Sequence, residues 1–220
     1  MTFARGGRHV SVNGYTSPVY ELLQAGLPQG SPLSPILFLF FNADLVQKAI
    51  NGAGGAIAFI DDYSAWVTGR SAEENTKIIQ DTIIPEAQQW EAERGASFDP
   101  GKTHFIHFSR TSAGERVSLT PIVFKDQVIQ PSQSVKLLGV IMDSGLRYGQ
   151  HIARTAKRGL EAARALKMLR GLRPETTRQL FTATVAPVVD YASAVWYPML
   201  PESRLHLLQA ALRIAAQAVI

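Results

Sequence analysis

The stretch "GLPQGSPLSPILFLFFNADLV", residues 26–46, changes character halfway along its length. Its first half is rich in glycine, proline and serine, and it contains two Ser-Pro pairs. Serine is a preferred N-cap residue and proline is favoured in the first helical turn, so each pair marks a possible helix start. The apolar residues that follow predict a helix over residues 34–50, preceded by a rigid turn.

A second marked stretch, "AIAFIDDYSAWVTG", covers residues 56–69. Two short apolar runs flank Asp61 and Asp62, which is the pattern of a β-hairpin with an acidic pair at its tip. Adjacent carboxylates repel each other and lose hydration on an apolar hairpin, and a divalent cation relieves both effects. Mg²⁺ prefers such oxygen ligands. Aspartate also favours turns for backbone reasons, so the pair alone fits a plain turn as well as a metal site.

The rest of the sequence before residue 149 mixes helix and strand patterns. Ser71 and Glu74 form a capping box for a helix that runs towards Gly95, and Pro85 should kink or split that helix. Further strands are expected at residues 103–109, 122–124, 127–130 and 135–143, and a hairpin at Asn13-Gly14 within residues 1–30.

After residue 149 the patterns are helical throughout. Helices are expected over residues 151–169, 174–189 and 201–220. The sequence therefore predicts a mixed α+β region over residues 1–149 and an all-helical region over residues 150–220. The last helical pattern is still running at Ile220, which favours a truncated reading frame.

Composition excludes several classes of protein. The chain has 220 residues, of which 46% are hydrophobic, so it can build a core and is not a disordered tail. It contains no cysteine, which rules out disulfides and thiolate metal sites. The longest apolar run, residues 36–41, is far shorter than the ~20 residues that span a bilayer. The first ten residues lack the apolar segment of a signal peptide. We therefore expect an intracellular protein with no membrane partner.

Positive charge gathers in one part of the chain. Residues 147–178 contain nine lysine and arginine residues but only two acidic ones, a local charge of about +7. On a helical wheel, the basic side chains at 154, 157, 158 and 164 lie opposite the apolar ones at 152, 156, 160, 163 and 166. Such a helix can pack with one face and meet phosphates with the other, although a solvated helix face fits the pattern equally well.

Together, residues 26–46 and 56–66 resemble the palm of reverse transcriptases from non-LTR (LINE-like) retrotransposons, chiefly fungal-type ones. The order and spacing are similar: a Gln-Gly-Ser-Pro loop and helix, then an aromatic-X-Asp-Asp hairpin. Further along, "FDPGKTHFIHF" resembles the family's lysine-bearing strand entry. "LLGVIMDSGLRYGQHI" is similar to the Leu-Gly turn that grips the primer and leads into the helical thumb. "LFTATVAPVVDYASAVW" resembles the segment after the thumb, so the likeness covers nearly the whole chain.

The resemblance implies a fold. Residues 1–149 would form a partial palm, an antiparallel sheet with packed helices, without the fingers and the first catalytic strand. Residues 150–220 would form the helical thumb and the start of the connection. The apolar residues 36–41 would belong to the core and hold the Gln-Gly loop still.

The resemblance also implies roles for individual residues. Asp61 and Asp62 would hold Mg²⁺, of which the intact family uses two, at a hairpin tip close to Gln29. Lys102 matches a lysine proposed to protonate the departing pyrophosphate, although a solvated turn lysine is an equal alternative. Residues expected beside the incoming deoxynucleoside triphosphate are Gln29, Gly30, Ser31, Pro32 and Phe59. Residues expected to contact the DNA primer paired with its RNA template are Leu138, Gly139, Arg154, Lys157 and Arg158.

One part of the family's pattern is missing. These polymerases need a further aspartate upstream of the Gln-Gly loop, and none of the 25 residues before Gly26 is aspartate. Asp143 is a poor substitute, because by resemblance it lies beyond the primer-gripping turn. We therefore expect weak Mg²⁺ binding and little or no polymerase activity from this chain alone.

Two other functions compete with this interpretation. "GKT" at residues 101–103 resembles part of a phosphate-binding loop, but the full motif needs glycine at the position of Ala96. That alternative is discounted. The stronger rival is a non-catalytic remnant that at most binds nucleic acid through the basic segment at residues 147–178.

Overall fold

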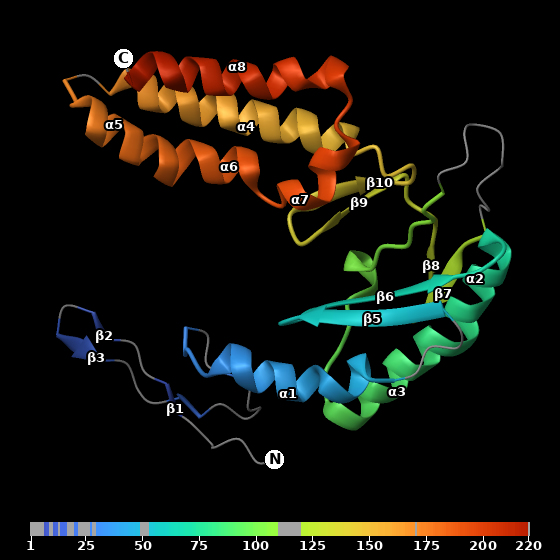
Figure 1. The fold of residues 1–220 in the computed structure, drawn as a ribbon. Helices are drawn as coiled ribbons and strands as arrows, with labels where there is room; N and C mark the ends of the chain where they lie inside the picture. Colours follow the sequence, from blue (N-terminus) through green and yellow to red (C-terminus); the bar gives the residue numbers. More distant parts are fainter. Residues whose placement is uncertain are drawn as a thin grey trace. The chain divides into compact units, whose positions relative to one another are not determined.

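The structure is a computed structural model that describes residues 7–8, 11–12, 14–16, 20–21, 27, 30–48, 53–109, 120–169 and 171–219. The chain forms two compact units, residues 1–97 and 98–220. Both contain helices and small antiparallel sheets, which confirms a mixed helix-and-sheet fold (Figure 1). Among the described strands every sheet is an antiparallel pair of two strands, and the assignment to a palm stays a prediction. No described helix combines the length and the apolar character needed to cross a membrane.

The strands near the N-terminus are short. β1 (Gly7–Arg8) pairs with β4 (Tyr20–Glu21), and β2 (Ser11–Val12) pairs with β3 (Tyr15–Thr16). Gly14, in the link between β2 and β3, has a φ of 82°, which suits glycine in a tight turn. The expected hairpin is confirmed by this pairing, although Asn13 lies outside the described residues.

Helix α1 (Ser34–Val46) begins at the second Ser-Pro pair, as expected. Its N-cap residue is Leu33 rather than a serine, and Pro35 lies in the first turn. Ser31 organises the entry, because its hydroxyl accepts a hydrogen bond from the Leu33 N–H (3.3 Å) and its carbonyl accepts one from the Ser34 N–H (3.1 Å). The first pair thus forms the turn and the second enters the helix.

The acidic pair belongs to a hairpin of β5 (Ala53–Phe59) and β6 (Asp62–Thr68). Gly55 stands opposite Trp66 across the two strands. A Cβ added at Gly55 would lie 2.4 Å from the indole ring of Trp66, so the ring covers the glycine. The hairpin predicted from the two apolar runs around the acidic pair is therefore confirmed.

After the hairpin come two helical segments that run into each other without a break. α2 (Ala72–Ile78) is capped by Ser71, whose hydroxyl accepts a hydrogen bond from the Glu74 N–H at 3.1 Å, which confirms the expected N-terminus. A π-helical turn at residues 79–83 leads into α3 (Ile84–Arg94), which ends at the left-handed Gly95. Pro85 lies in the first turn of α3. The helix widens before this proline because proline has no N–H and its ring crowds the carbonyl four residues earlier.

Among the described residues, helix α1 packs on one side. Leu45 is 2% exposed, and the ring of Phe41 meets the ring of Trp90 on α3 edge to face at 5.1 Å. Asp44 accepts hydrogen bonds from the indole N–H of Trp90 (3.1 Å) and from Arg94. Burial raises the pKa of Asp44, but the hydrogen bonds from Trp90 and Arg94 and the charge of Arg94 outweigh it, so the net pKa is lowered.

The expectation that residues 36–41 are core is wrong for three of them. Ile36, Leu39 and Phe40 expose 51%, 59% and 75% of their surface. The reason is the arrangement of neighbours: among the described residues, α1 contacts β5 and α3, and the α3 contact falls on the side that carries Phe41 and Leu45.

The second unit begins with turns and hairpins. A 3₁₀ turn at Pro100–Lys102 precedes two hairpins, β7 (Ile122–Phe124) with β8 (Gln127–Ile129), and β9 (Ser134–Leu137) with β10 (Val140–Asp143).

The strand expected at residues 103–109 is wrong. Phe105 alone forms a bridge, to Pro131, and the Ser109 N–H donates to the Ser144 carbonyl at 2.9 Å. Phe105 and His107 are buried and Phe108 is 45% exposed, but the residues that pair with this segment are loop residues that offer no continuous ladder.

The rest of the second unit is helical. α4 (Gly149–Met168) lies beside α8 (Glu202–Val219) and the α5–α6 segment (Figure 1). That segment joins α5 (Pro174–Leu180) to α6 (Ala186–Asp190) through a π-helical turn at residues 181–185, and the short α7 (Ser193–Trp196) and a 3₁₀ turn at Tyr197–Met199 follow. The expected helices are therefore present, and the palm and thumb boundary at residue 149 stays a prediction.

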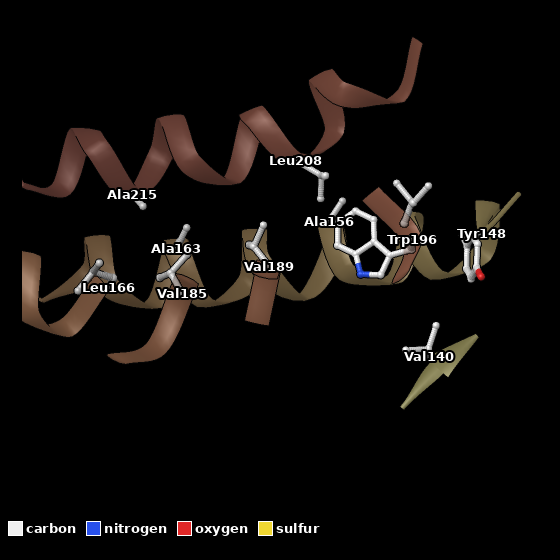
Figure 2. Close-up of a cluster of buried hydrophobic side chains, with 11 residues drawn as sticks. Val140, Tyr148, Ala156, Ala163, Leu166, Val185, Val189, Trp196, Leu208 and Ala215 are labelled. Atoms are coloured by element: carbon white, nitrogen blue, oxygen red, sulfur yellow. The ribbon is translucent and has the colours of Figure 1, made fainter. Parts of the chain in front are cut away.

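Small residues bring these helices close together. Ala156 and Ala163 of α4 and Ala215 of α8 belong to a buried cluster that also contains Val189 of α6 (Figure 2). A Cβ added at Gly159 would lie 2.7 Å from a methyl carbon of Val189, so this position accepts no side chain without movement. The close approach of α4 and α6 therefore depends on glycine, which has no side chain, at position 159.

Candidate functional site

The acidic hairpin ends in a two-residue turn. Phe59 pairs with Asp62, so Ile60 and Asp61 form the turn. Ile60 has a φ of 54°, a left-handed conformation that is unfavourable for a β-branched residue. The side-chain amide of the buried Asn42 donates a hydrogen bond to the Ile60 carbonyl, which fixes the turn to the second half of α1.

The two faces of this hairpin differ. Asp62 shares its face with Phe59 directly opposite, and Phe59 is 58% exposed. The other face carries Tyr63, where burial, with a smaller effect from the charge of Glu86, raises the pKa to about 12. Asp61 and Asp62 are both exposed. The structure thus brings together three predicted site residues, two carboxylates and an aromatic ring, at one end of the hairpin.

The carboxylate ligands in this turn are of the type that Mg²⁺ prefers, but there are too few of them to hold the ion alone. Carboxylate oxygens are ligands that Mg²⁺ prefers. In the part of the chain that the structure describes, no group of three histidine, cysteine, aspartate or glutamate side chains could hold a metal ion. The turn therefore offers two carboxylates for an ion that would need further ligands from elsewhere.

Asp143 has a different task. One oxygen of its carboxylate accepts hydrogen bonds from the N–H groups of Gly145 (3.1 Å) and Arg147 (3.0 Å). Its backbone carbonyl accepts one from the Leu146 N–H at 2.8 Å. Asp143 thus shapes the turn between β10 and α4. This role agrees with the expectation that Asp143 is a poor substitute for the missing aspartate.

The loop before α1 is described only in part. Gln29 lies outside the described residues, and so does its expected proximity to the acidic pair. Gly30 has a φ of 92°, and no atom of the described residues lies within 4 Å of a Cβ added there. Ser31 is half-buried and Pro32 is exposed. The loop therefore leads directly into the helix whose Asn42 holds the acidic turn.

Lys102 is presented by a capped turn in the second unit. The carboxylate of Asp99 accepts a hydrogen bond from the Gly101 N–H at 2.8 Å, which shapes the 3₁₀ turn. The ammonium of Lys102 lies 3.9 Å from a carboxylate oxygen of Asp99, and its side chain is 86% exposed. An ion pair this exposed contributes little. Both the catalytic role and the plain turn role of Lys102 stay predictions.

The expected primer-gripping turn is the tight turn of the β9–β10 hairpin. Leu137 pairs with Val140, and the two turn residues, Leu138 and Gly139, have φ values of 44° and 88°. The hydroxyl of Tyr191 donates a hydrogen bond to the Leu138 carbonyl at 2.7 Å. Sequence reasoning missed this contact, because the two residues are 53 positions apart.

The basic face of α4 is arranged as the helical wheel predicts. Lys157 and Arg158 are exposed and Arg154 is half-buried, whereas Ile152 is fully buried. His151 is also buried, and its Nδ1 accepts a hydrogen bond from the Ile141 N–H at 3.3 Å. Burial and, to a smaller extent, the charge of Arg154 lower the pKa of His151. The face of α4 towards solvent is therefore cationic and its opposite face belongs to the core.

Known proteins resemble the chain in sequence. The family described as reverse transcriptase (RNA-dependent DNA polymerase) matches residues 9–142. The retrovirus-related Pol polyprotein from the type-1 retrotransposable element R1 2 of Nasonia vitripennis is 28% identical over 184 residues, 80% of this chain and 44% of that protein. The probable RNA-directed DNA polymerase from transposon BS of Drosophila melanogaster is 27% identical over 194 residues, 84% of this chain and 21% of its own length.

A further relative is the RNA-directed DNA polymerase from the mobile element jockey of Drosophila melanogaster, 29% identical over 150 residues, 66% of this chain and 16% of that polymerase. The chain spans less than half the length of the curated relatives it matches. No solved structure matches it. The family match and these relatives confirm the expectation from the two motifs, while the fungal affinity stays a prediction. This chain belongs to the reverse transcriptase (RNA-dependent DNA polymerase) family, as a domain of the non-LTR retrotransposon type.

Proposed function

We propose that the chain supplies part of the palm and the thumb of an RNA-directed DNA polymerase. Its substrates would be an RNA template, a DNA primer and deoxynucleoside triphosphates. The observation that carries this proposal is the acidic turn of Asp61 and Asp62, held to α1 by the hydrogen bond from Asn42 to Ile60. Because Asn42 bonds to the backbone of the turn, the side-chain carboxylates of Asp61 and Asp62 stay free to face a substrate.

The proposed chemistry depends on positioning. Phosphoryl transfer asks a protein mainly to align the reacting groups and to stabilise their charge. Gly30, Ser31, Pro32 and Phe59 would lie beside the triphosphate, with Phe59 next to the primer end. Mg²⁺ held by Asp61 and Asp62 would supply charge neutralisation when bound.

The direct test of catalysis is primer extension. We expect the 220-residue chain to give no template-dependent extension on an RNA template with Mg²⁺, because the described residues offer no third ligand beside the acidic pair. Extension that Asp61→Ala abolishes would contradict this expectation. It would show that a complete metal site forms, and Asp143→Asn would be the next variant to test.

The basic face of α4 supports nucleic-acid binding independently of catalysis. Each phosphate that a cation neutralises releases counterions, so the affinity for an RNA–DNA duplex should fall steeply with salt. Replacing Arg154, Lys157 and Arg158 together with alanine should flatten the slope of log K against log salt by about 2 to 3. Preference among sequences should not change, because backbone contacts carry no base information.

A matched control replaces basic residues on other helices. Arg178 on α5 and Arg213 on α8 are exposed, and their joint replacement with alanine should leave most of the slope intact. Circular dichroism must show equal helical content in all variants before slopes are compared. An unchanged slope in the triple variant would remove the thumb assignment from α4 and leave the proposal resting on the acidic turn.

A further inference from the structure

The turn of Leu138 and Gly139 is held from outside its own hairpin. Tyr191, which follows α6, donates its hydroxyl hydrogen to the Leu138 carbonyl at 2.7 Å. A Cβ added at Gly139 would lie 3.0 Å from a ring carbon of Tyr191, so the ring also rests against the glycine. One side chain therefore contacts both residues of the turn.

Tyr191 is itself held in place by the core. The indole N–H of Trp196 donates to the Tyr191 carbonyl at 2.9 Å, and Trp196 is 1% exposed. Ala192 adopts a left-handed φ of 52°, which turns the chain sharply between α6 and α7. The exposed Tyr191 side chain thus stands on a fixed backbone.

The same tryptophan connects this contact to α4. The ring of Trp196 meets the ring of His151 at 5.7 Å, and His151 accepts a hydrogen bond from the Ile141 N–H on β10. The hairpin is therefore attached to the helices at two points, its turn through Tyr191 and its second strand through His151. The turn and the basic helix belong to one packed body.

We propose that Tyr191 is a positioning residue that holds the Leu138–Gly139 turn in the conformation that contacts the backbone of a nucleic-acid duplex. This inference rests on the proposed function of the turn. A carbonyl and a phosphate oxygen are both acceptors, so a carbonyl that faced the duplex would repel it. Tyr191 occupies the Leu138 carbonyl and turns it towards the protein. The turn can then meet a phosphate with N–H groups, which are ordinary phosphate contacts.

The test uses Tyr191→Phe in the full chain, which removes the hydroxyl and keeps the ring over Gly139. The affinity for a short RNA–DNA duplex should fall about threefold to tenfold, the range expected for one hydrogen bond. The salt slope should stay unchanged, because no charge is removed. A purely structural role in the helices would instead change helical content, which circular dichroism reports.

Tyr197→Phe is the matched control. Tyr197 is 55% exposed against 54% for Tyr191, and its hydroxyl has no hydrogen-bond partner among the described residues. This variant should bind the duplex as the parent does. Hydrogen exchange read on residues 138–140 should accelerate in Tyr191→Phe only, while exchange in α4 stays as in the parent.

The outcomes separate this proposal from the function on which it rests. A parent chain that does not bind the duplex contradicts the proposed function, and faster exchange at the turn then still supports Tyr191 as the residue that holds it. Unchanged exchange at the turn overturns the proposal in either case. A parent that binds, with equal affinities for the Tyr191→Phe and Tyr197→Phe variants, also overturns it.

Discussion

Two tight turns, one in each compact unit, are each held by a hydrogen bond from a distant side chain, but they present different groups to solvent. Ile60 and Leu138 each begin a two-residue turn in the left-handed region, with φ values of 54° and 44°. The carbonyl of each accepts a hydrogen bond from a distant side chain, Asn42 in one unit and Tyr191 in the other. A bulky residue is strained in this conformation, so a contact from elsewhere must hold it.

The second turn residue shows what each turn presents. The first turn continues with Asp61, a side chain that can carry a ligand, whereas the second continues with Gly139, which presents only its backbone. The supports differ as well, because Asn42 is 7% exposed and Tyr191 is 54% exposed. Under the proposed function, a buried support would suit a turn fixed beneath reacting groups, and an exposed one would suit a turn that meets the nucleic-acid backbone.

The largest expected effect comes from removing a buried tryptophan from each unit. Trp196→Ala should destabilise the second unit by about 3–5 kcal/mol, the usual cost of emptying a fully buried aromatic site. Trp90→Ala, with the residue 3% exposed and bonded to Asp44, should do the same to the first unit. Hydrogen exchange measured peptide by peptide should rise within residues 98–220 for the first variant and within residues 1–97 for the second. Faster exchange in both units for either variant would contradict the expectation that each tryptophan stabilises its own unit.

The next effect tests the difference in burial between the two supports. Asn42→Leu should cost about 1–3 kcal/mol in unfolding free energy, because the buried donor to Ile60 is lost. Tyr191→Phe should cost at most about 1 kcal/mol, because water can replace an exposed hydroxyl. Chemical denaturation of both variants measures the two values. Equal costs would show that burial does not distinguish the supports.

A smaller effect, of opposite sign, is expected from the strained residue itself. Asparagine tolerates the left-handed region better than a β-branched residue does, so Ile60→Asn should raise stability by about 1 kcal/mol. Tighter Mg²⁺ binding is not expected, since the carboxylates are unchanged. Thermal unfolding of the variant measures the gain, and a loss of stability would show that the Ile60 side chain packs more than its 38% exposure indicates.

The last effect is a pH dependence of the first unit, which has no consequence near neutral pH. The pKa of Tyr63 is raised from 10.0 to about 12 by burial, so the folded state resists its ionisation. The resulting stability is fully present below pH 10 and is lost as the pH rises towards 12. Tyr63→Phe should flatten the unfolding free energy across that window. An identical alkaline loss in this variant would place its cause elsewhere, with the buried Tyr148 of the second unit, whose pKa is also raised, examined first.

The sequence predicts most of the elements and few of the contacts between them. The hairpin at Asp61, the cap at Ser71 and the end of α3 at Gly95 carry local signals that the structure confirms. The bonds from Asn42 to Ile60 and from Tyr191 to Leu138 join residues 18 and 53 positions apart, and no periodicity encodes them.

Burial and strand pairing are harder to predict from the sequence. The apolar run at residues 36–41 predicts a core, but burial depends on which neighbours cover a face, and Phe40 is 75% exposed. The alternation at residues 103–109 agrees with the burial of Phe105 but not with the 45% exposure of Phe108. It also predicts strand pairing wrongly, since a ladder needs a second strand beside it.

The close approach at Gly159 also has a consequence for how copies of such an element diverge. Every missense change in a glycine codon adds at least a Cβ, and here that atom would meet Val189 at 2.7 Å. Neutral substitutions should therefore accumulate at the exposed arginines of α4 sooner than at Gly159. Among diverged copies, an intact glycine at this position would mark those in which α4 and α6 can pack as they do here without moving.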